Sequence, residues 1–257
     1  MTRAVVALLV ALCILAGACT APGGGEPPLV ATTTWLLADV VRSIGEDDVE
    51  VVPLIPAGAD PERHPGRPLA DMERRPDLVV TVGLGFEGGM ADLVAEARTA
   101  GIPVVEVAPV GEPLAAADGT PDPRVWLDPL RMASTAPVIA FWLTGLVPEP
   151  GVAYWQGRGR AYADRLRSLH GVMDRRLEVV SELAAGSPGL EYVAQRYGLD
   201  MVEPPRGSVI VDATDQVLAE VEPGSRPVPV ALDDLGGASG YADFLSNLAD
   251  AIVDEGR

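Results

Sequence analysis

The chain has 257 residues, of which 48% are hydrophobic and 22% charged, which is typical of a globular protein and excludes a disordered or fibrous one. The 19 basic residues, all arginine, are outnumbered by 37 acidic ones, so the net charge is -18. No basic face is expected that would neutralise phosphates, and nucleic acid is therefore not an expected partner. A chain of this length forms one large or two modest lobes, and we expect two.

The first residues have the layout of a secretory signal. Arg3 precedes an apolar run over residues 4–15, which is shorter than the ~20 apolar residues of a membrane span. Small residues then lead directly to Cys19, in an arrangement that resembles a bacterial lipobox, where the cysteine is lipidated and becomes the new N-terminus. We expect residues 1–18 to be a signal peptide and residues 19–28 a flexible, lipid-anchored tether outside the bacterial cell membrane. The alternative is a plain secreted protein in which Cys19 has no role.

The cysteine count limits the chemistry of the mature chain. The chain contains two cysteines, Cys13 in the expected signal peptide and Cys19 at the expected lipidation site. The mature body would then carry no thiol, which excludes disulfides, cysteine-based zinc sites and a cysteine nucleophile.

Short β-branched runs alternate with amphipathic segments in the first half of the chain. The expected strands cover residues 29–33, 50–54, 78–82 and 103–107. Such alternation predicts parallel strands joined by crossover helices. The runs are apolar without a polar alternation, as expected when helices cover both faces of a sheet.

Longer helical patterns follow in the second half. The pattern predicts a helix from Pro129 to about Leu146 and a long amphipathic helix over residues 151–185, although three glycines weaken the second. The remaining expected elements are a helix at 190–197, strands at 208–211 and 227–232, and a final helix at 239–254.

Several stretches, in chain order, carry a family resemblance. These stretches are Thr32–Trp35, Ile44–Gly45, Leu54–Pro61, Asp77–Val80 with Gly83–Glu87, Asp122–Pro129, Tyr192–Leu199 and Leu232–Leu235. Together they resemble the solute-binding lipoproteins of bacterial zinc and manganese ABC transporters. The resemblance covers nearly the whole mature chain.

The resemblance implies an α/β fold of two lobes, each with a parallel-type sheet flanked by helices, joined by one long bridging helix. The expected boundaries are 29–148 for the N-terminal lobe, 149–186 for the bridging helix and 187–257 for a shortened C-terminal lobe. It also implies a divalent metal ion in the cleft between the lobes and a cognate ABC permease as partner. The expected function is delivery of zinc or manganese to that permease.

The metal site departs from the family pattern at most of its ligand positions. Glu62 stands where the family has its first histidine, with His64 the only histidine nearby, and Arg124 stands where the family has its second. The third ligand position aligns with Ser187, and Asp233 stands where the acidic ligand belongs. One hypothesis is a zinc or manganese site made by His64, Glu62 and Asp233, whose carboxylates favour a harder ion or weaker binding.

The rival hypothesis starts from Arg124, because a guanidinium is always charged and repels a divalent ion. Beside Glu62 and Asp233, Arg124 would form charge-assisted hydrogen bonds, replace the metal as an internal cation and hold the cleft closed. The chain would then be a degenerate scaffold lipoprotein that binds no metal and acts as an accessory or interaction protein.

We expect no catalytic residues. The stretch Gly83–Gly88 matches the G-x-G-x-x-G dinucleotide fingerprint, but the export signal argues against a soluble nicotinamide cofactor. No Gly-x-Ser-x-Gly elbow is present, and two histidines leave few arrangements for a Ser-His-Asp hydrolase. The sequence thus predicts a binding protein and not an enzyme.

Overall fold

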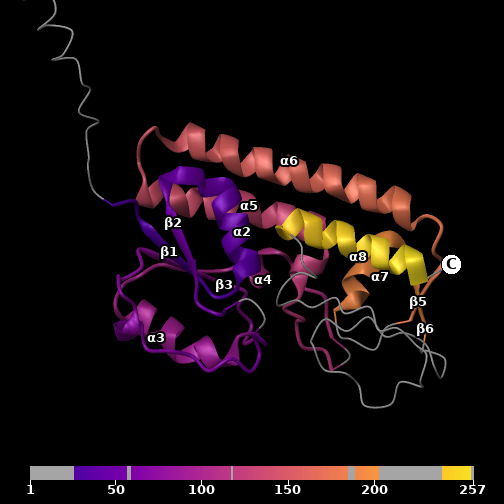
Figure 1. Cartoon of the computed structure of the whole chain (residues 1–257), viewed down its shortest axis with the longest axis horizontal. Coiled ribbons are helices and arrows are strands. Elements are labelled where there is room, and N and C mark those ends of the chain that lie inside the picture. The colour runs from indigo at the N-terminus through magenta and orange to yellow at the C-terminus, as the bar shows by residue number, and fades with distance from the viewer. Residues whose placement is uncertain (1–25, 57–58, 117, 185–188, 203–238, 256–257) are drawn as a thin grey trace, which may run out of the picture.

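A computed structural model of the chain describes residues 26–56, 59–116, 118–184, 189–202 and 239–255 (Figure 1). The expected signal peptide and the strands expected at 208–211 and 227–232 lie outside these residues.

The N-terminal lobe is built on a four-stranded parallel sheet in the order β2-β1-β3-β4. Its strands are β1 (Leu29–Thr32), β2 (Glu50–Pro53), β3 (Leu78–Thr81) and β4 (Val104–Glu106). All four expected strands are confirmed, with ends that differ by at most one residue. Every residue of β1 and β3, the two central strands, is buried, which explains their continuous apolar character.

Helices cover both faces of this sheet. Its helices are α2 (Trp35–Gly45), α3 (Ala91–Thr99), α4 (Val107–Val110) and α5 (Pro129–Leu146), with short 3-10 turns at Glu46–Asp48, Leu69–Asp71, Gly88–Met90 and Val125–Leu127. Because successive side chains of a strand point to opposite faces, Val30 packs in a core with α2 and α5, whereas Ala31 packs in a second core with Leu93 and Ala97 of α3. The sheet therefore lies between two apolar cores.

Side-chain caps define where two of these helices begin. The Thr34 hydroxyl accepts a hydrogen bond from the Leu37 amide at the start of α2. The Asp128 carboxylate accepts from the amides of Leu130 and Arg131 at 2.9 and 3.3 Å, with Pro129 as the first residue of α5. Both are standard N-cap arrangements, and they satisfy amide groups that have no partner inside the helix.

The long helix α6 (Val152–Leu177) runs along the length of the molecule and joins the two lobes (Figure 1). The expected extension of this helix to residue 185 was wrong, because Glu182–Ala184 forms strand β5. β5 pairs in parallel with β6 (Asp200–Val202), which the sequence did not predict. Pairing with a partner distant in sequence therefore prevails over the helical periodicity of this segment.

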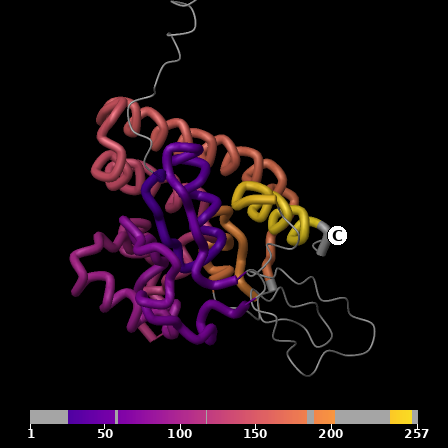
Figure 2. The backbone as a smooth tube through the Cα atoms, turned by 60° about the vertical axis from the view of Figure 1, so that its left-hand side comes forward, coloured from indigo at the N-terminus to yellow at the C-terminus, as the bar shows by residue number. Residues whose placement is uncertain are grey.

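The described part of the C-terminal lobe is small. It contains the two-stranded sheet β5-β6, the expected helix α7 (Leu190–Tyr197) and the final helix α8 (Tyr241–Glu255). α8 packs against α6, and the fully buried Tyr241 donates a hydrogen bond from its hydroxyl to the Trp126 carbonyl at 2.7 Å. Figure 2 shows the yellow α8 beneath α6 and beside the indigo α2 of the N-terminal lobe. The two lobes are thus joined by more than the bridging helix.

Substitutions at two glycines of α6 are expected to have opposite effects on the free energy of unfolding. A Cβ at Gly159 would lie 2.7 Å from the Ala140 Cβ of α5, whereas a Cβ at Gly157 would meet nothing within 4 Å. We expect Gly159→Leu to lower the free energy of unfolding by about 2 to 3 kcal/mol through overpacking. The control Gly157→Ala should raise it by about 0.5 to 1 kcal/mol, because alanine favours the helix. Urea denaturation followed by circular dichroism measures both, and equal effects would exclude close α5–α6 packing as the cause.

Candidate functional site

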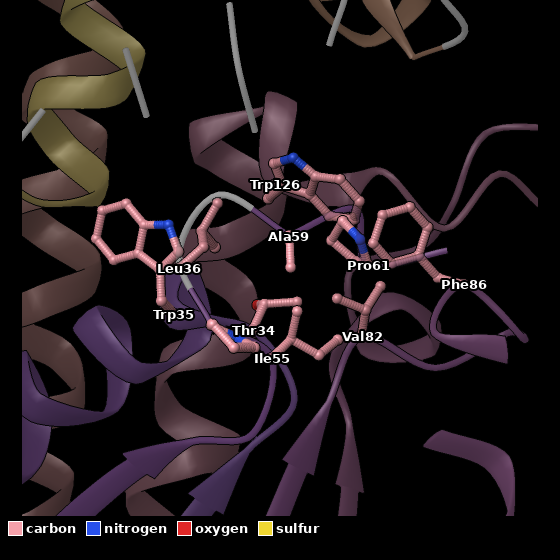
Figure 3. A pocket seen from close by; sticks show the side chains of 10 residues that line it. Thr34, Trp35, Leu36, Ile55, Ala59, Pro61, Val82, Phe86 and Trp126 are labelled. Atoms are coloured by element: carbon pink, nitrogen blue, oxygen red, sulfur yellow. The ribbon is translucent and has the colours of Figure 1, made fainter. Parts of the chain in front are cut away.

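The strand order places a crevice at the carboxyl end of the N-terminal sheet. β2, which follows β1, lies on one side of β1, whereas β4, which follows β3, lies on the far side of β3, so the chain leaves β1 and β3 in opposite directions. Ligands of open α/β sheets bind at such a switch point. Here a small pocket is lined by Thr34, Trp35, Leu36, Ile55, Pro56, Ala59, Pro61, Val82, Phe86 and Trp126 (Figure 3).

This pocket is almost entirely apolar. Figure 3 shows the Trp126 ring on the opposite side of the pocket from Thr34, Ile55 and Val82. The free volume is about 20 Å³, which is room for about one water molecule. Its lining residues include no carboxylate and no histidine, and the Thr34 hydroxyl already caps α2. In this conformation the pocket offers no set of metal ligands.

A buried carboxylate fixes the loops at this end of the sheet. Glu87 is 5% exposed and accepts hydrogen bonds from the Val82 and Gly83 amides at 2.7 and 3.2 Å and from the Thr81 hydroxyl at 3.0 Å. The Thr33 hydroxyl, directly after β1, also donates to it. Glu87 therefore ties the loop after β3 to the end of β1.

The glycines of the apparent dinucleotide fingerprint belong to the same loop. Gly83, Leu84 and Gly85 have φ values of +86°, +55° and +78°, in the left-handed region that favours glycine. A Cβ at Gly83 would also lie 2.7 Å from the Glu106 carboxylate. The turn itself accounts for Gly83 and Gly85, without a nucleotide.

Arg124 lies at the mouth of the crevice and pairs with two carboxylates. Its guanidinium contacts the Glu62 Oε1 at 2.6 Å and the Asp122 Oδ1 at 3.3 Å, and its Cζ lies 5.6 Å from the centre of the Phe86 ring. The Arg124 amide also donates to Asp122 at 2.9 Å. The Arg124 side chain is 16% exposed and that of Glu62 44%. The guanidinium is thus mostly enclosed and contacts Glu62, Asp122 and the Phe86 ring.

The C-terminal lobe contacts this arginine directly. Gly189, which precedes α7, packs so closely that a Cβ there would lie 2.5 Å from the Arg124 Cδ. The Tyr192 hydroxyl donates to the Asp122 carbonyl at 2.6 Å and accepts from the Leu114 amide at 2.9 Å. Burial raises the pKa of Tyr192 to about 12, so the phenol stays neutral and remains a donor. Arg124 therefore lies at the boundary between the two lobes.

A second ion pair joins the lobes near this point. The Asp128 side chain is 2% exposed and accepts from Arg196 of α7 at 2.8 and 2.6 Å. Arg131 lies 3.3 Å from the same carboxylate. The segment from Asp122 to Asp128 is therefore held from both lobes.

The predicted metal ligands are brought together only in part. Glu62 pairs with Arg124, and the two share a shallow pocket whose lining does not include His64. The half-buried His64 donates its amide to the Asp60 carbonyl at 2.8 Å. Asp233, Ser187 and Cys19 lie outside the described residues. Within the described ranges, no group of three or more His, Cys, Asp and Glu side chains is placed to hold a metal ion.

Sequence reasoning missed three residues that shape this site: Glu87, Asp122 and Tyr192. All three lie in stretches that carried the family resemblance, but none was singled out. Asp122 carried a local signal, because an aspartate two residues before Arg124 can accept from its backbone amide. Glu87 and Tyr192 act on residues distant in sequence, and no local pattern reveals such contacts.

Two α/β lobes joined by a long helix, with a pocket at the carboxyl end of the N-terminal sheet, are the architecture of two-lobed solute-binding proteins. Residues 30–230 match the family model described as zinc-uptake complex component A, periplasmic. The chain belongs to this family, which confirms the resemblance carried by its motifs.

Individual relatives agree with this assignment. The chain is 26% identical over 182 residues to the zinc-binding protein TroA of Treponema pallidum, covering 68% of this chain and 58% of TroA. It is 28% identical over 186 residues to the manganese-binding lipoprotein MntA of Halalkalibacterium halodurans, covering 69% of this chain and 60% of MntA. The matched part thus spans less than two thirds of either curated relative.

Solved structures show the same fold. The structure of the periplasmic zinc-binding protein TroA from Treponema pallidum matches with a TM-score of 0.69 at 19% identity, covering 90% of this chain and all (100%) of TroA. A zinc-bound deletion mutant of ZnuA matches with a TM-score of 0.73 at 20% identity, covering 90% of this chain and 98% of ZnuA. The expected two-lobed α/β fold is confirmed.

Proposed function

We propose that the chain is the extracytoplasmic solute-binding component of a divalent-metal ABC transporter, with an altered metal site. The family match over residues 30–230 carries this proposal. It is supported by two relatives that are named for binding zinc and manganese. The partners of the chain would be a cognate permease and, through a lipid on Cys19, the cell membrane. Its role is binding and release of an ion, not catalysis.

The proposed metal ligands are His64, Glu62 and Asp233. This set mixes one imidazole with two carboxylates, which suits manganese or a weakly held zinc ion. The Glu62 Oε1 already contacts Arg124 at 2.6 Å, so an incoming ion competes with the guanidinium for this carboxylate. Metal binding is therefore expected to be weaker than in a site made of histidines.

A second candidate function is favoured by the contacts of Arg124. The guanidinium already neutralises Glu62, is fixed by Asp122 and the Phe86 ring, and packs against Gly189 of the other lobe. In this alternative Arg124 serves as a permanent internal cation that holds the cleft closed. The chain would then be a scaffold lipoprotein that binds no metal and serves as an accessory or interaction protein.

Titration of the metal-free protein with zinc and then manganese separates the two candidates. If the chain is a metal carrier, calorimetry should show saturable one-to-one binding that Asp233→Ala abolishes and the control Asp118→Ala, at a fully exposed carboxylate, does not. A metal at about 100 times its Kd should also stabilise the folded protein by about 2.7 kcal/mol. Absence of heat and of stabilisation in a folded protein would contradict transport and support the scaffold.

A further inference from the structure

Helix α5 carries an exposed apolar surface that its packing does not explain. No charged residue occurs between Arg131 and Glu149. One side of the helix packs against α6 and is buried, but Phe141 and Trp142 on the other side are 65% and 37% exposed. Their rings form an edge contact with 6.2 Å between centroids. A helix that is apolar all round normally has a partner on each side.

Neighbouring residues extend this surface. Val138 and Leu146 of α5 are half-buried beside the two aromatic residues, and Val152 at the start of α6 is 53% exposed. We call these five residues, Val138, Phe141, Trp142, Leu146 and Val152, the α5 apolar face. Within the described part of the chain, no helix is long and apolar enough to cross a bilayer.

The chain enters the fold at the same end of the molecule. The Trp155 indole donates to the Val147 carbonyl at 2.8 Å, which closes the turn between α5 and α6, and the Tyr154 hydroxyl donates to Asp48 at 2.9 Å. Two residues after Asp48, the Glu50 amide donates to the Pro28 carbonyl at 2.9 Å. Figures 1 and 2 both show the start of β1 on the side of the turn between α5 and α6.

We propose that the α5 apolar face lies against the lipid bilayer to which the chain is anchored. The inference rests on the lipid anchor of the proposed function. From Cys19 to Glu26 a fully extended tether spans about 25 Å at most, so the anchor holds this end of the molecule near the bilayer. Phe and Trp side chains lie favourably at the headgroup level of a bilayer, so the end of the molecule that the anchor holds close also carries a surface suited to contact the bilayer.

Charge identifies the kind of lipid surface. The chain has a net charge of -18, and the exposed Glu149 lies in the sequence between Leu146 and Val152 of the α5 apolar face. Attraction to anionic headgroups therefore does not drive the contact. Because burial of apolar area drives it, the contact should persist in high salt and should be stronger on neutral phosphatidylcholine than on anionic phosphatidylglycerol.

Environment-sensitive labels on the full, lipid-anchored chain test this orientation. The label is attached to a single introduced cysteine, in Phe141→Cys or in Val152→Cys, and its emission is recorded on phosphatidylcholine vesicles. Val179→Cys, labelled in the same way, is the matched control. Val179 is 70% exposed and follows the far end of α6, whose 26 residues span about 39 Å. We expect blue-shifted emission and quenching of about twofold or more by brominated acyl chains at 141 and 152, and neither at 179.

Each other outcome overturns the proposal in a recognisable way. If the labels at 141 and 152 emit as in water, and the labelled variants melt at the same temperature as the unlabelled protein, the α5 apolar face lies in solvent. A blue shift that appears without vesicles in Cys19→Ser protein and grows with concentration would make a second copy the partner. If the wild-type chain does not float with vesicles, the anchor is absent and the inference fails with it. Metal titration is unaffected in every case, so the transport proposal is judged separately.

Discussion

Replacing Glu87 with leucine is expected to lower the free energy of unfolding by about 3 to 5 kcal/mol, a large effect for one substitution. The carboxylate is 5% exposed and accepts from two backbone amides and two threonine hydroxyls. Leucine would leave these buried donors without an acceptor. The loops after β1 and β3 would lose their common attachment, and the crevice at the end of the sheet would lose its shape.

Two controls separate the lost hydrogen bonds from the substitution itself. Glu87→Gln keeps the shape and one acceptor oxygen but points an amide group at donors, so an intermediate loss is expected. Glu73→Gln changes an exposed carboxylate of the same lobe and should leave stability unchanged within about 0.5 kcal/mol. Urea unfolding followed by far-UV circular dichroism measures all three variants. A Glu87→Leu variant as stable as the wild type would contradict the role assigned to this carboxylate.

The N-terminal lobe was predictable because its signals are local. β1 and β3 are buried on both faces, so their sequences are short apolar runs rich in β-branched residues, whose length and composition favour a strand over a buried helix. α5 was predictable at both ends, since Asp128 and Pro129 mark its start and the apolar pattern ends at Leu146. An element whose own residues determine its structure can be predicted from the sequence alone.

The C-terminal lobe was less predictable because its elements depend on each other. β6 has only three residues, and Asp200 and Met201 are exposed, so it lacks the apolar run that marks a strand. β5 follows the amphipathic α6 without a proline or glycine between them, and only its pairing with β6 distinguishes it from more helix. The strands expected in the C-terminal lobe at 208–211 and 227–232 lie outside the described residues and stay predictions.

The contacts of the candidate site were likewise predictable only in part. The proximity of Arg124 and Glu62 followed from the family resemblance, although 62 positions separate the two residues. The contact of Thr33 with Glu87 and that of Tyr192 with Asp122 join residues 54 and 70 positions apart, and neither had a local signal. Whether His64 and Asp233 meet at a metal ion stays a prediction.

Replacing Arg124 with histidine is expected to tighten zinc binding by about tenfold or more, which corresponds to about 1.4 kcal/mol. The substitution removes a permanent positive charge that repels the ion. It frees Glu62 from its 2.6 Å ion pair and places an imidazole where the family has its second histidine. The gain should fall as the pH drops below about 6.5, because a protonated imidazole cannot bind zinc.

Arg124→Gln is the matched control, because it removes the charge and the ion pair but supplies no imidazole. We expect it to bind zinc more weakly than the histidine variant, by calorimetry on metal-free protein at pH 7.5 and again at pH 5.5. Equal affinities of the two variants, both above the wild type, would assign the whole effect to the lost charge. If neither variant binds zinc more tightly than the wild type while both melt cooperatively, the ion pair of Arg124 is not what limits metal binding in this cleft.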